Sequence, residues 1–330
     1  MDFSLIIPVY NRPDEVDELL QSLTRQTDKD FEVLVLEDKS EHLCENVCQK
    51  YTDRLRLHYY YRPGTGRSER RNLGVEYASG DYYIFFDSDC VIPQDYIASL
   101  RQVLTENYVD CYGGPDAAAD DFSDIQKAVN YSMTSIMTTG GIRGAMKQKS
   151  KFMPRSFNMG FSRHCYEAVG GFRNMICEDS DLSIRIKEAK ISTTLIPQAY
   201  VYHKRRMDLR RFYKQVNTFG KGRVLLSRLH PGSLHIVHLF PTFFFIGHLI
   251  LLVLAFWSAW FLLPIAVYIT GIFVEAYLKN ASVRVAALAI ATTYIQLSGY
   301  GIGFLDECFT QKTSRTAQEE LYGKDSAKIS

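Results

Sequence analysis

The chain has 330 residues, of which 46% are hydrophobic and 13% aromatic, so it can hold one large α/β domain with an appendage or two domains. Its formal net charge is only +1, and the overall charge therefore indicates neither a nucleic-acid partner nor an acidic one. Seven cysteines are scattered without a CxxC pair, which argues against a zinc site and is typical of a reducing compartment.

The first hundred residues alternate between strand and helix patterns. Short apolar runs predict strands at Phe3 to Val9, Phe31 to Leu36, Leu55 to Tyr61 and Tyr82 to Phe86. Helix-spaced apolar residues follow Pro13 and the Gly64 to Gly66 turn. Such repeats predict a mostly parallel, doubly wound sheet that binds ligands beyond the carboxyl ends of its strands. Asp38 and Asp87 follow predicted strands, so we expect both at that edge.

The pattern is less regular between Asp110 and Phe172. Gly140 and the basic residues after it predict a mobile loop, and Phe157 to Ser162 predicts a strand. Glu178 to Ala189 predicts a helix with acidic residues in its first turn, which the helix dipole favours. A mostly apolar strand is expected from Thr194 to Val201.

The tripeptide Asp87-Ser88-Asp89 directly follows the fourth predicted strand. Two carboxylates two residues apart can direct oxygen ligands at one divalent cation, and Mg²⁺ typically takes only one or two protein carboxylates. Such a cation would neutralise a departing nucleoside diphosphate. An acidic turn at the surface is the alternative interpretation.

A second acidic motif runs from Glu178 to Asp181 at the start of a predicted helix. Ser180 or Asp181 can serve simply as a helix cap, because negative charge is stabilised at this end of a helix. The functional alternative makes Asp179 a general base that takes the proton of an acceptor hydroxyl.

His203 follows the last predicted strand and stands directly before a basic run. A neutral imidazole there can be a further metal ligand. A surface or packing role is the alternative.

These motifs occur together and in a fixed order, and in that arrangement the chain resembles a family 2 glycosyltransferase with a GT-A fold. The resemblance covers about residues 3 to 225. Its elements are Ser4 to Arg12, Glu37 to Ser40, Arg70 to Gly74, Ala78 to Asp81, Asp87 to Asp89, Gly170 to Phe172, Glu178 to Leu182, and His203. It implies an α/β nucleotide-binding domain of GT-A type with a mostly parallel central sheet, followed by a helical membrane region.

The resemblance implies roles at the donor pocket for residues early in the chain. Pro8, Tyr10 and Asp38 would line the nucleoside pocket, with Asp38 accepting a hydrogen bond from a uracil-type imide. Arg71 would approach the nucleotide-sugar, and Asn72 would help to order that loop.

The resemblance also implies a metal site beside the donor. Asp87 and Ser88 would meet the ribose or the metal, and Asp89 would bind the metal itself. His203 would complete the environment of the metal and the diphosphate. The expected cofactor is Mg²⁺ or Mn²⁺.

Glu178 and Asp179 are the candidate catalytic residues, with Asp179 as the base of a single, inverting displacement. Glu37 stands where the family often has Asp, which leaves the role of this residue open. The Gln-x-x-Arg-Trp element of processive synthases is also missing after His203, where the chain reads Gln215 to Phe219. Its absence favours transfer of one sugar per encounter.

The last third of the chain has an uneven charge distribution. The segment from Lys204 to Arg228 is densely basic, whereas no Asp, Glu, Lys or Arg occurs from Leu229 to Val274. A membrane-spanning helix needs about 20 apolar residues, so this stretch can hold two. A third uncharged stretch, Val285 to Leu305, is less apolar and could cross the membrane or lie in its interface. The alternative is a buried helical subdomain of a soluble protein.

We therefore expect a catalytic domain at 1–228, transmembrane or membrane-associated helices at 229–305 and a polar tail at 306–330. The chain begins directly with a strand pattern and no secretory signal is predicted. Together with the basic run, this predicts a catalytic domain on the cytoplasmic side of the inner membrane.

The predicted function is transfer of one sugar from a nucleotide-sugar, UDP-linked, to a saccharide or lipid-linked acceptor in cell-surface glycan assembly. The expected partners are this donor, this acceptor and membrane lipid, without nucleic acid. Two alternatives stay open: a polyprenyl-phosphate glycosyltransferase, whose ionised acceptor needs no base, and a catalytically silent membrane adaptor that keeps the nucleotide fold.

Overall fold

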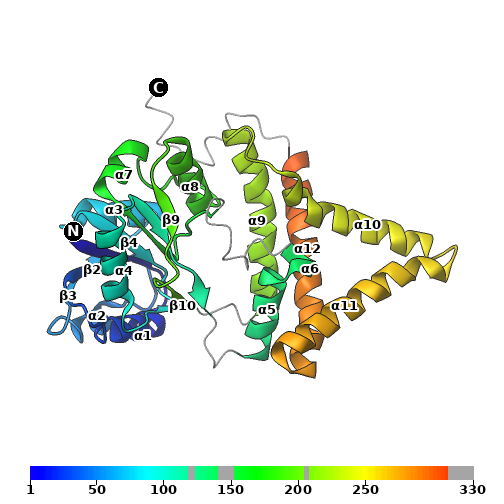
Figure 1. Ribbon diagram of the computed structural model, residues 1–330, viewed down its shortest axis with the longest axis horizontal. Helices are drawn as coiled ribbons and strands as arrows, with labels where there is room; N and C mark the ends of the chain where they lie inside the picture. Colours follow the sequence, from blue (N-terminus) through cyan, green and yellow to red (C-terminus); the bar gives the residue numbers. More distant parts are fainter. Residues whose placement is uncertain (118–122, 140–151, 204–207, 311–330) are drawn as a thin grey trace. The chain divides into compact units, whose positions relative to one another are not determined.

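The computed structural model describes residues 1–117, 123–139, 152–203 and 208–310 (Figure 1). These residues form two compact units. We call residues 1–117 and 152–203 the α/β unit, and residues 123–139 and 208–310 the helical unit. The predicted loop after Gly140 lies outside the described residues.

A seven-stranded sheet forms the centre of the α/β unit, in the order β3-β2-β1-β4-β8-β6-β9. The strands are β1 (Phe3–Val9), β2 (Phe31–Glu37), β3 (Arg56–Tyr61), β4 (Tyr82–Phe86), β6 (Cys111–Gly113), β8 (Asn158–Ser162) and β9 (Thr193–Leu195). Strands β1 to β4 are parallel, and β8 runs antiparallel to β4 and β6. The mostly parallel sheet expected from the sequence is confirmed.

Helices cover both faces of this sheet. They are α1 (Pro13–Leu23), α2 (Glu45–Gln49), α3 (Arg67–Tyr77), α4 (Tyr96–Glu106), α7 (Arg163–Val169) and α8 (Glu178–Glu188). Successive side chains of a strand point to opposite faces. Leu5 accordingly packs in a core with Leu19 of α1, whereas Ile6 packs in a second core with Leu182 of α8.

A smaller three-stranded sheet consists of β5 (Cys90–Val91), β10 (Val201–His203) and β7 (Asp116–Ala117). The continuous strand predicted from Thr194 to Val201 is wrong, because this segment divides between β9 and β10 in two different sheets. Pro197 between them has no amide hydrogen for a strand ladder, and Ala199 N–H donates to the Ile196 carbonyl in a turn. Pairing of β10 with β5 sets His203 opposite Cys90.

The helical unit contains six α-helices within the residues described. They are α5 (Asp124–Thr134), α6 (Ile136–Thr139), α9 (Leu209–Leu229), α10 (Phe240–Leu254), α11 (Leu263–Asn280) and α12 (Val283–Phe309). Three stretches are long and apolar enough to cross a membrane: Ile236–Leu254, Ala259–Asn280 and Val283–Phe309. The predicted apolar region is thus confirmed as helices, which indicates membrane association.

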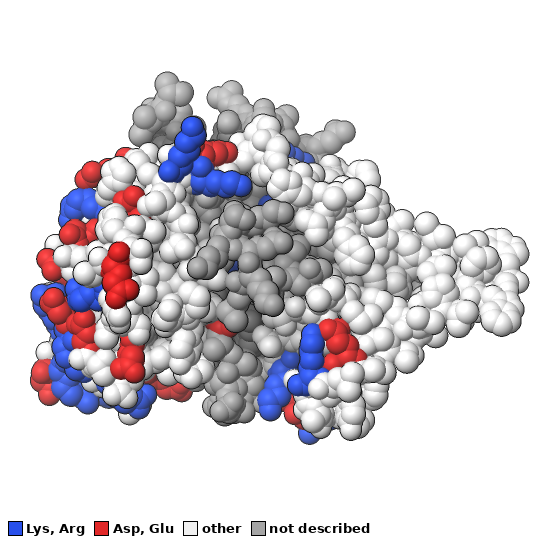
Figure 2. Space-filling model, viewed as in Figure 1, with Lys and Arg blue, Asp and Glu red and all other residues white. Residues whose placement is uncertain are grey.

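Charged side chains are distributed differently over the two units. In Figure 2 they are frequent over the α/β unit, whereas the projecting surface of α10 and α11 is white beyond its base. From Leu209 onward the basic segment forms α9, a helix with one buried face that includes Phe212 and Val216. Helix α5 was not predicted, although Ser123 and Gln126 form a capping box at its start.

Candidate active site

The carboxyl ends of β1, β2 and β4 form one edge of the large sheet. Val9, the last residue of β1, is in register with Glu37, the last residue of β2. Asp38 follows β2 directly, and its N–H donates to the Val9 carbonyl at 3.1 Å. Asp87 follows β4. Both aspartates therefore lie at the strand-end edge where the sequence predicts ligand binding.

Asp38 is an ionised carboxylate held by several donors. Its Oδ1 accepts from the N–H groups of Lys39 at 2.7 Å and Gly64 at 2.8 Å, and its Oδ2 pairs with Arg70. Burial alone would raise the pKa of Asp38, but these hydrogen bonds and the guanidinium outweigh it and lower the pKa. A carboxylate has about four lone-pair sites, so further acceptor capacity remains for a ligand.

The residues at the end of β1 differ in exposure. Pro8 is buried inside the strand, whereas Tyr10, just beyond it, has 54% of its surface exposed. Asn11 adopts a φ of 54°, in the left-handed region that asparagine tolerates better than most residues. Its N–H donates to Ser40 Oγ at 2.9 Å, and its Oδ1 accepts from Glu41 N–H at 2.6 Å. These bonds hold the loops after β1 and β2 together.

Glu37, the last residue of β2, lies wholly buried at this edge. Its Oε2 accepts from Cys44 N–H at 2.7 Å and from the Tyr59 hydroxyl at 2.6 Å. Burial and the neighbouring Glu37 carboxylate raise the pKa of Tyr59, so this hydroxyl stays protonated as a donor. Glu37 therefore links the end of β2 to β3 and to the residue before α2.

Arg71 of α3 joins three distant segments of the chain. It is completely buried, and its Nη2 contacts Asp87 Oδ1 at 2.8 Å while its Nη1 contacts Glu178 Oε1 at 2.9 Å. The Phe172 ring lies 5.2 Å from the guanidinium carbon. A buried guanidinium is tolerated only when it is paired. The Arg71 network therefore fixes the end of β4 beside the start of α8.

Asn72 holds the turn that contains Phe172. Its Nδ2 donates to the Phe172 carbonyl and its Oδ1 accepts from the Phe172 N–H, both at 2.8 Å. On the other side, Arg185 donates to the Gly171 carbonyl at 2.8 Å. Gly170 has a φ of 73°, which only glycine adopts without strain. Asn72 and Arg185 thus set the position of the Phe172 ring against Arg71.

The acidic residues at the start of α8 have different surroundings. Asp181 is completely buried between Arg173 at 3.2 Å and Arg185 at 2.9 Å, so it is a structural residue. Glu178 pairs with Arg71. Asp179 is partly exposed, and its Oδ1 accepts from Ser180 N–H at 2.7 Å within the first turn.

The Asp87-Ser88-Asp89 motif lies where the chain passes from β4 into β5. Ser88 is buried, and Asp89 pairs with Arg12 Nη1 at 2.7 Å. The side chain of His203 lies outside the described residues, although the backbone register places this residue opposite Cys90, next to Asp89.

The carboxylates after β4 can hold a divalent cation only together with other ligands. Within the described part of the chain, no three His, Cys, Asp or Glu side chains converge as a complete metal site. Asp87 and Asp89 nevertheless lie together at a strand end, with 28% and 12% of their side chains exposed. Two carboxylates fit Mg²⁺ or Mn²⁺ when water and phosphate oxygens fill the other positions.

The sequence analysis assigned no role to Arg12 or Arg70, which pair with carboxylates of the site. Arg12 pairs with Asp89 and Arg70 with Asp38, and both arginines belong to the motif segments already recognised. Both arginines could have been predicted as partners, because carboxylates close together at a sheet edge need cations nearby.

The comparisons with known proteins identify the family. The model of glycosyl transferase family 2 matches residues 4–170, and the chain belongs to this family. The motifs of the sequence predict this family membership.

The curated relatives match over part of their length. An uncharacterised glycosyltransferase of Rickettsia felis is 37% identical over 107 residues, which cover 32% of this chain and 17% of that protein. Glycosyltransferase GlyA of Streptococcus pneumoniae is 33% identical over 108 residues, covering 32% of this chain and 16% of that protein. The chain thus spans about a sixth of the length of these relatives.

Solved structures show the same fold at low sequence identity. The mannosyltransferase PcManGT from Pyrobaculum calidifontis, in complex with GDP-Man and Mn²⁺, has a TM-score of 0.61 at 15% identity and covers 94% of this chain and 88% of its own. S. aureus TarS 1–349 in complex with UDP-GlcNAc has a TM-score of 0.50 at 17% identity and covers 93% and 91%. The predicted α/β fold of GT-A type is confirmed.

Proposed function

We propose that this chain is an inverting, non-processive glycosyltransferase that moves one sugar from a UDP-linked donor to a saccharide or lipid-linked acceptor in cell-surface glycan assembly. The Arg71 network carries this proposal. By binding Asp87 and Glu178 together, it brings the strand end that carries Asp87 next to the helix turn that carries Asp179. Asp87, which is proposed to meet the sugar donor, and the proposed base Asp179 are thereby held in fixed relative positions.

Asp38 is the proposed recognition group for the nucleoside. Its pKa is lowered, so it is ionised at neutral pH and can accept the imide N–H of uracil. The UDP-GlcNAc bound by TarS supports a UDP-linked donor. The GDP-Man bound by PcManGT is the competing choice of nucleotide in this fold.

Asp179 is the proposed general base. It is the partly exposed carboxylate of the α8 turn, whereas Asp181 and Glu178 are engaged with arginines. A base that removes the proton of the acceptor hydroxyl permits one direct displacement at the anomeric carbon, which inverts its configuration.

Asp89 and Asp87 are the proposed metal ligands, with His203 as a further candidate. When bound, Mg²⁺ or Mn²⁺ supplies positive charge that stabilises the leaving diphosphate. Arg12 and Arg71 hold the two carboxylates in place, and the Mn²⁺ in PcManGT supports the assignment.

The long apolar helices support membrane association of the enzyme. We propose that the α/β unit faces the cytoplasm, because basic residues such as Arg223 and Arg228 closely precede the apolar helices and are retained on that side. A lipid-linked acceptor would meet the enzyme at this surface.

The test is a panel of UDP-, GDP- and dTDP-sugars with the full chain, measuring release of nucleoside diphosphate with Mn²⁺, with Mg²⁺ and with chelator. We expect turnover of a UDP-sugar that the chelator abolishes. Asp38→Ala should reduce the preference for UDP, whereas Asp53→Ala, at an exposed side chain beside Arg54, should not. Release from a GDP-sugar alone would overturn the UDP assignment, and release from none would overturn the transferase.

A further inference from the structure

The three apolar stretches of the helical unit have different surroundings. The protein buries 6% of the most apolar part of Ile236–Leu254 and 11% of that of Ala259–Asn280. The corresponding share in Val283–Phe309 is 50%. The first two, which contain α10 and α11, form a projecting hairpin in Figure 1, whereas α12 packs against α9 and α5 and also against the base of the hairpin. Contacts within the protein thus account for about half of the apolar stretch of α12.

Helix α12 packs along α9 through close backbone contact. Asn217 Nδ2 donates to the Gly299 carbonyl at 3.2 Å, and a Cβ on Gly303 would overlap the Asn217 backbone. At the carboxyl ends of the two helices, Arg228 pairs with Glu307 at 3.1 Å. These contacts make α9 and α12 parallel neighbours over most of the length of α9.

The charges of α9 decide where α12 can lie. The first half of α9 exposes three cations, Arg210, Arg211 and Lys214. In the second half of α9, Lys221 pairs with Asp306 of α12 at 2.5 Å. If α12 crossed the bilayer, α9 beside it would carry these cations into the hydrocarbon core. Charged side chains at that depth are costly and are rare away from partners or water. Helix α12 therefore does not fit a membrane crossing.

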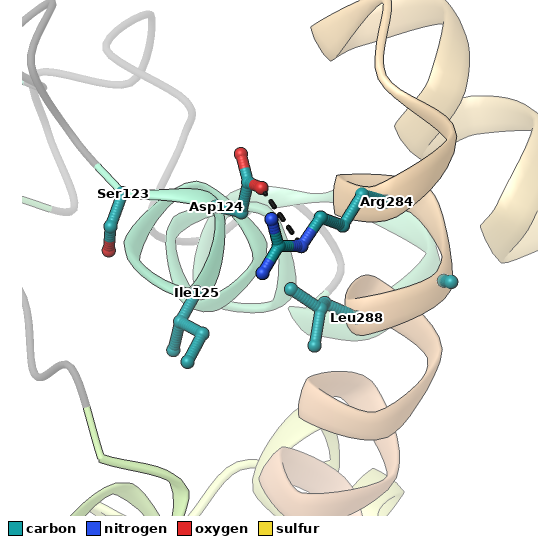
Figure 3. Close-up of a pocket in the computed structure, with 6 residues that line it drawn as sticks. Ser123, Asp124, Ile125, Arg284 and Leu288 are labelled. Atoms are coloured by element: carbon teal, nitrogen blue, oxygen red, sulfur yellow. Dashed lines mark ion pairs between the residues drawn. The ribbon is translucent and has the colours of Figure 1, made fainter.

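The amino end of α12 is polar as well. Arg284 reaches Asp124 of α5 at 3.3 Å, and 82% of its side chain is exposed. Figure 3 shows this pair in an open recess, with Ser123 on the α5 side and Leu288 one turn along α12. Both ends of α12 are thus joined by ion pairs to helices with polar surfaces.

The α10–α11 hairpin has the opposite character. Its turn exposes Phe256 by 91% and Trp257 and Trp260 by 78% each. The charged residue nearest to this turn is Glu275, close to the base of the hairpin, where it accepts from Tyr131 of α5 at 2.7 Å and pairs with Lys279 at 2.5 Å. Long uncharged helices with exposed apolar side chains and tryptophans fit a lipid environment.

We propose that the α10–α11 hairpin is the only part of the described chain that enters the hydrocarbon core, and that α12 lies with α9 at the membrane surface. The partner is a lipid bilayer whose anionic headgroups meet the basic side chains of α9. The link from β10 to α9 is far shorter than the roughly 20 residues of a crossing, so the α/β unit and both ends of α12 are on the same side.

The native Cys308, exposed near the end of α12, provides a direct test. The full chain is treated with a membrane-impermeant maleimide in intact cells and in inverted vesicles, with Cys308→Ser as the blank. Added to the Cys308→Ser variant, Asp53→Cys marks the α/β unit and Phe309→Cys provides a second label beside position 308; these side chains are 78% and 79% exposed. We expect Cys308, Phe309→Cys and Asp53→Cys to react from the same side. Reaction of positions 308 and 309 from the side opposite to position 53 would overturn the proposal.

A matched pair of lysine substitutions tests insertion independently of labelling. Ala291→Lys places a charge on the exposed face of α12, and Leu252→Lys places one on α10, where the side chain is 50% exposed. We expect Ala291→Lys to leave the amount of membrane-bound protein within twofold of wild type and Leu252→Lys to lower it at least tenfold. Equal losses for the two variants would show that α12 also enters the hydrocarbon and would overturn the proposal.

Discussion

The α/β unit and the α10–α11 hairpin of the helical unit differ in how they place charged side chains. The α/β unit buries ionised groups and pairs them, as at Arg71 with Asp87 and Glu178. In the same unit, burial would raise the pKa of Glu32, but the Ser4 hydroxyl and nearby backbone N–H groups lower it. The α10–α11 hairpin instead leaves apolar side chains exposed. The charged residue nearest to its turn, Glu275, lies close to the base of the hairpin.

This difference follows from what each region is proposed to contact, a nucleotide-sugar in one case and a lipid bilayer in the other. A donor site for a polyanionic substrate needs carboxylates and guanidiniums held in fixed geometry, which low-dielectric pairing provides. A bilayer instead favours helices without charged side chains, such as those of the α10–α11 hairpin. Glycines along α12 allow its close approach to α9, outside the hydrocarbon core.

The largest effect should follow removal of the proposed base. Asp179→Asn keeps the size of the side chain but cannot take a proton, so we expect sugar transfer to fall about 10²- to 10⁴-fold. Donor binding, measured by calorimetry, should change little. Retained transfer by this variant would instead favour a phosphate acceptor, which is already ionised, and loss of donor binding would remove Asp179 from the base role.

The next effect tests the buried ion network of the α/β unit. Arg71→Leu leaves Asp87 and Glu178 without their cation, and we expect a loss of about 3–5 kcal/mol in the free energy of unfolding together with loss of activity. Arg67→Leu is the matched control, because Arg67 is 60% exposed and lies 3.9 Å from the same Glu178 oxygen. Its cost should stay below about 1 kcal/mol. Similar midpoints of thermal unfolding for the two variants would show that the buried Arg71 ion pairs are not needed for stability.

A smaller effect is expected from crowding the contact between α9 and α12. A side chain on Gly303 would meet the Asn217 backbone, so Gly303→Leu should force the helices apart at a cost of about 1–3 kcal/mol. Gly247→Leu in α10 is the control, since no atom lies within 4 Å of a Cβ built there. Thermal unfolding of the full chain in detergent measures both, and a larger loss for Gly247→Leu would refute this packing.

The smallest effect concerns pH. Because the pKa of folded Asp38 is lowered, its charge stabilises the fold fully above the unfolded value near 4 and less as the pH falls through the folded pKa. The difference in unfolding temperature between wild type and Asp38→Asn should therefore narrow below about pH 4. A constant difference down to pH 3 would show that ionised Asp38 contributes no stability.

The sequence alone determined the elements whose apolar runs are fully buried. Strand β4 has the predicted bounds and β1 and β2 differ by at most one residue, because continuous apolar runs suit strands covered on both faces. Asp38 and Asp87 were placed at strand ends for the same reason. The apolar helices were equally clear, since uncharged stretches of this length are rare in soluble folds.

Tertiary structure decided what depends on contacts between distant residues. The pairing of Arg71 with Glu178 joins positions 107 residues apart, which no local pattern specifies. The division of Thr194 to Val201 between two sheets depends on which neighbours each half finds. The surroundings of α12 likewise appear only when α9 and α5 are packed against it, because hydropathy records how apolar a helix is and not what covers it.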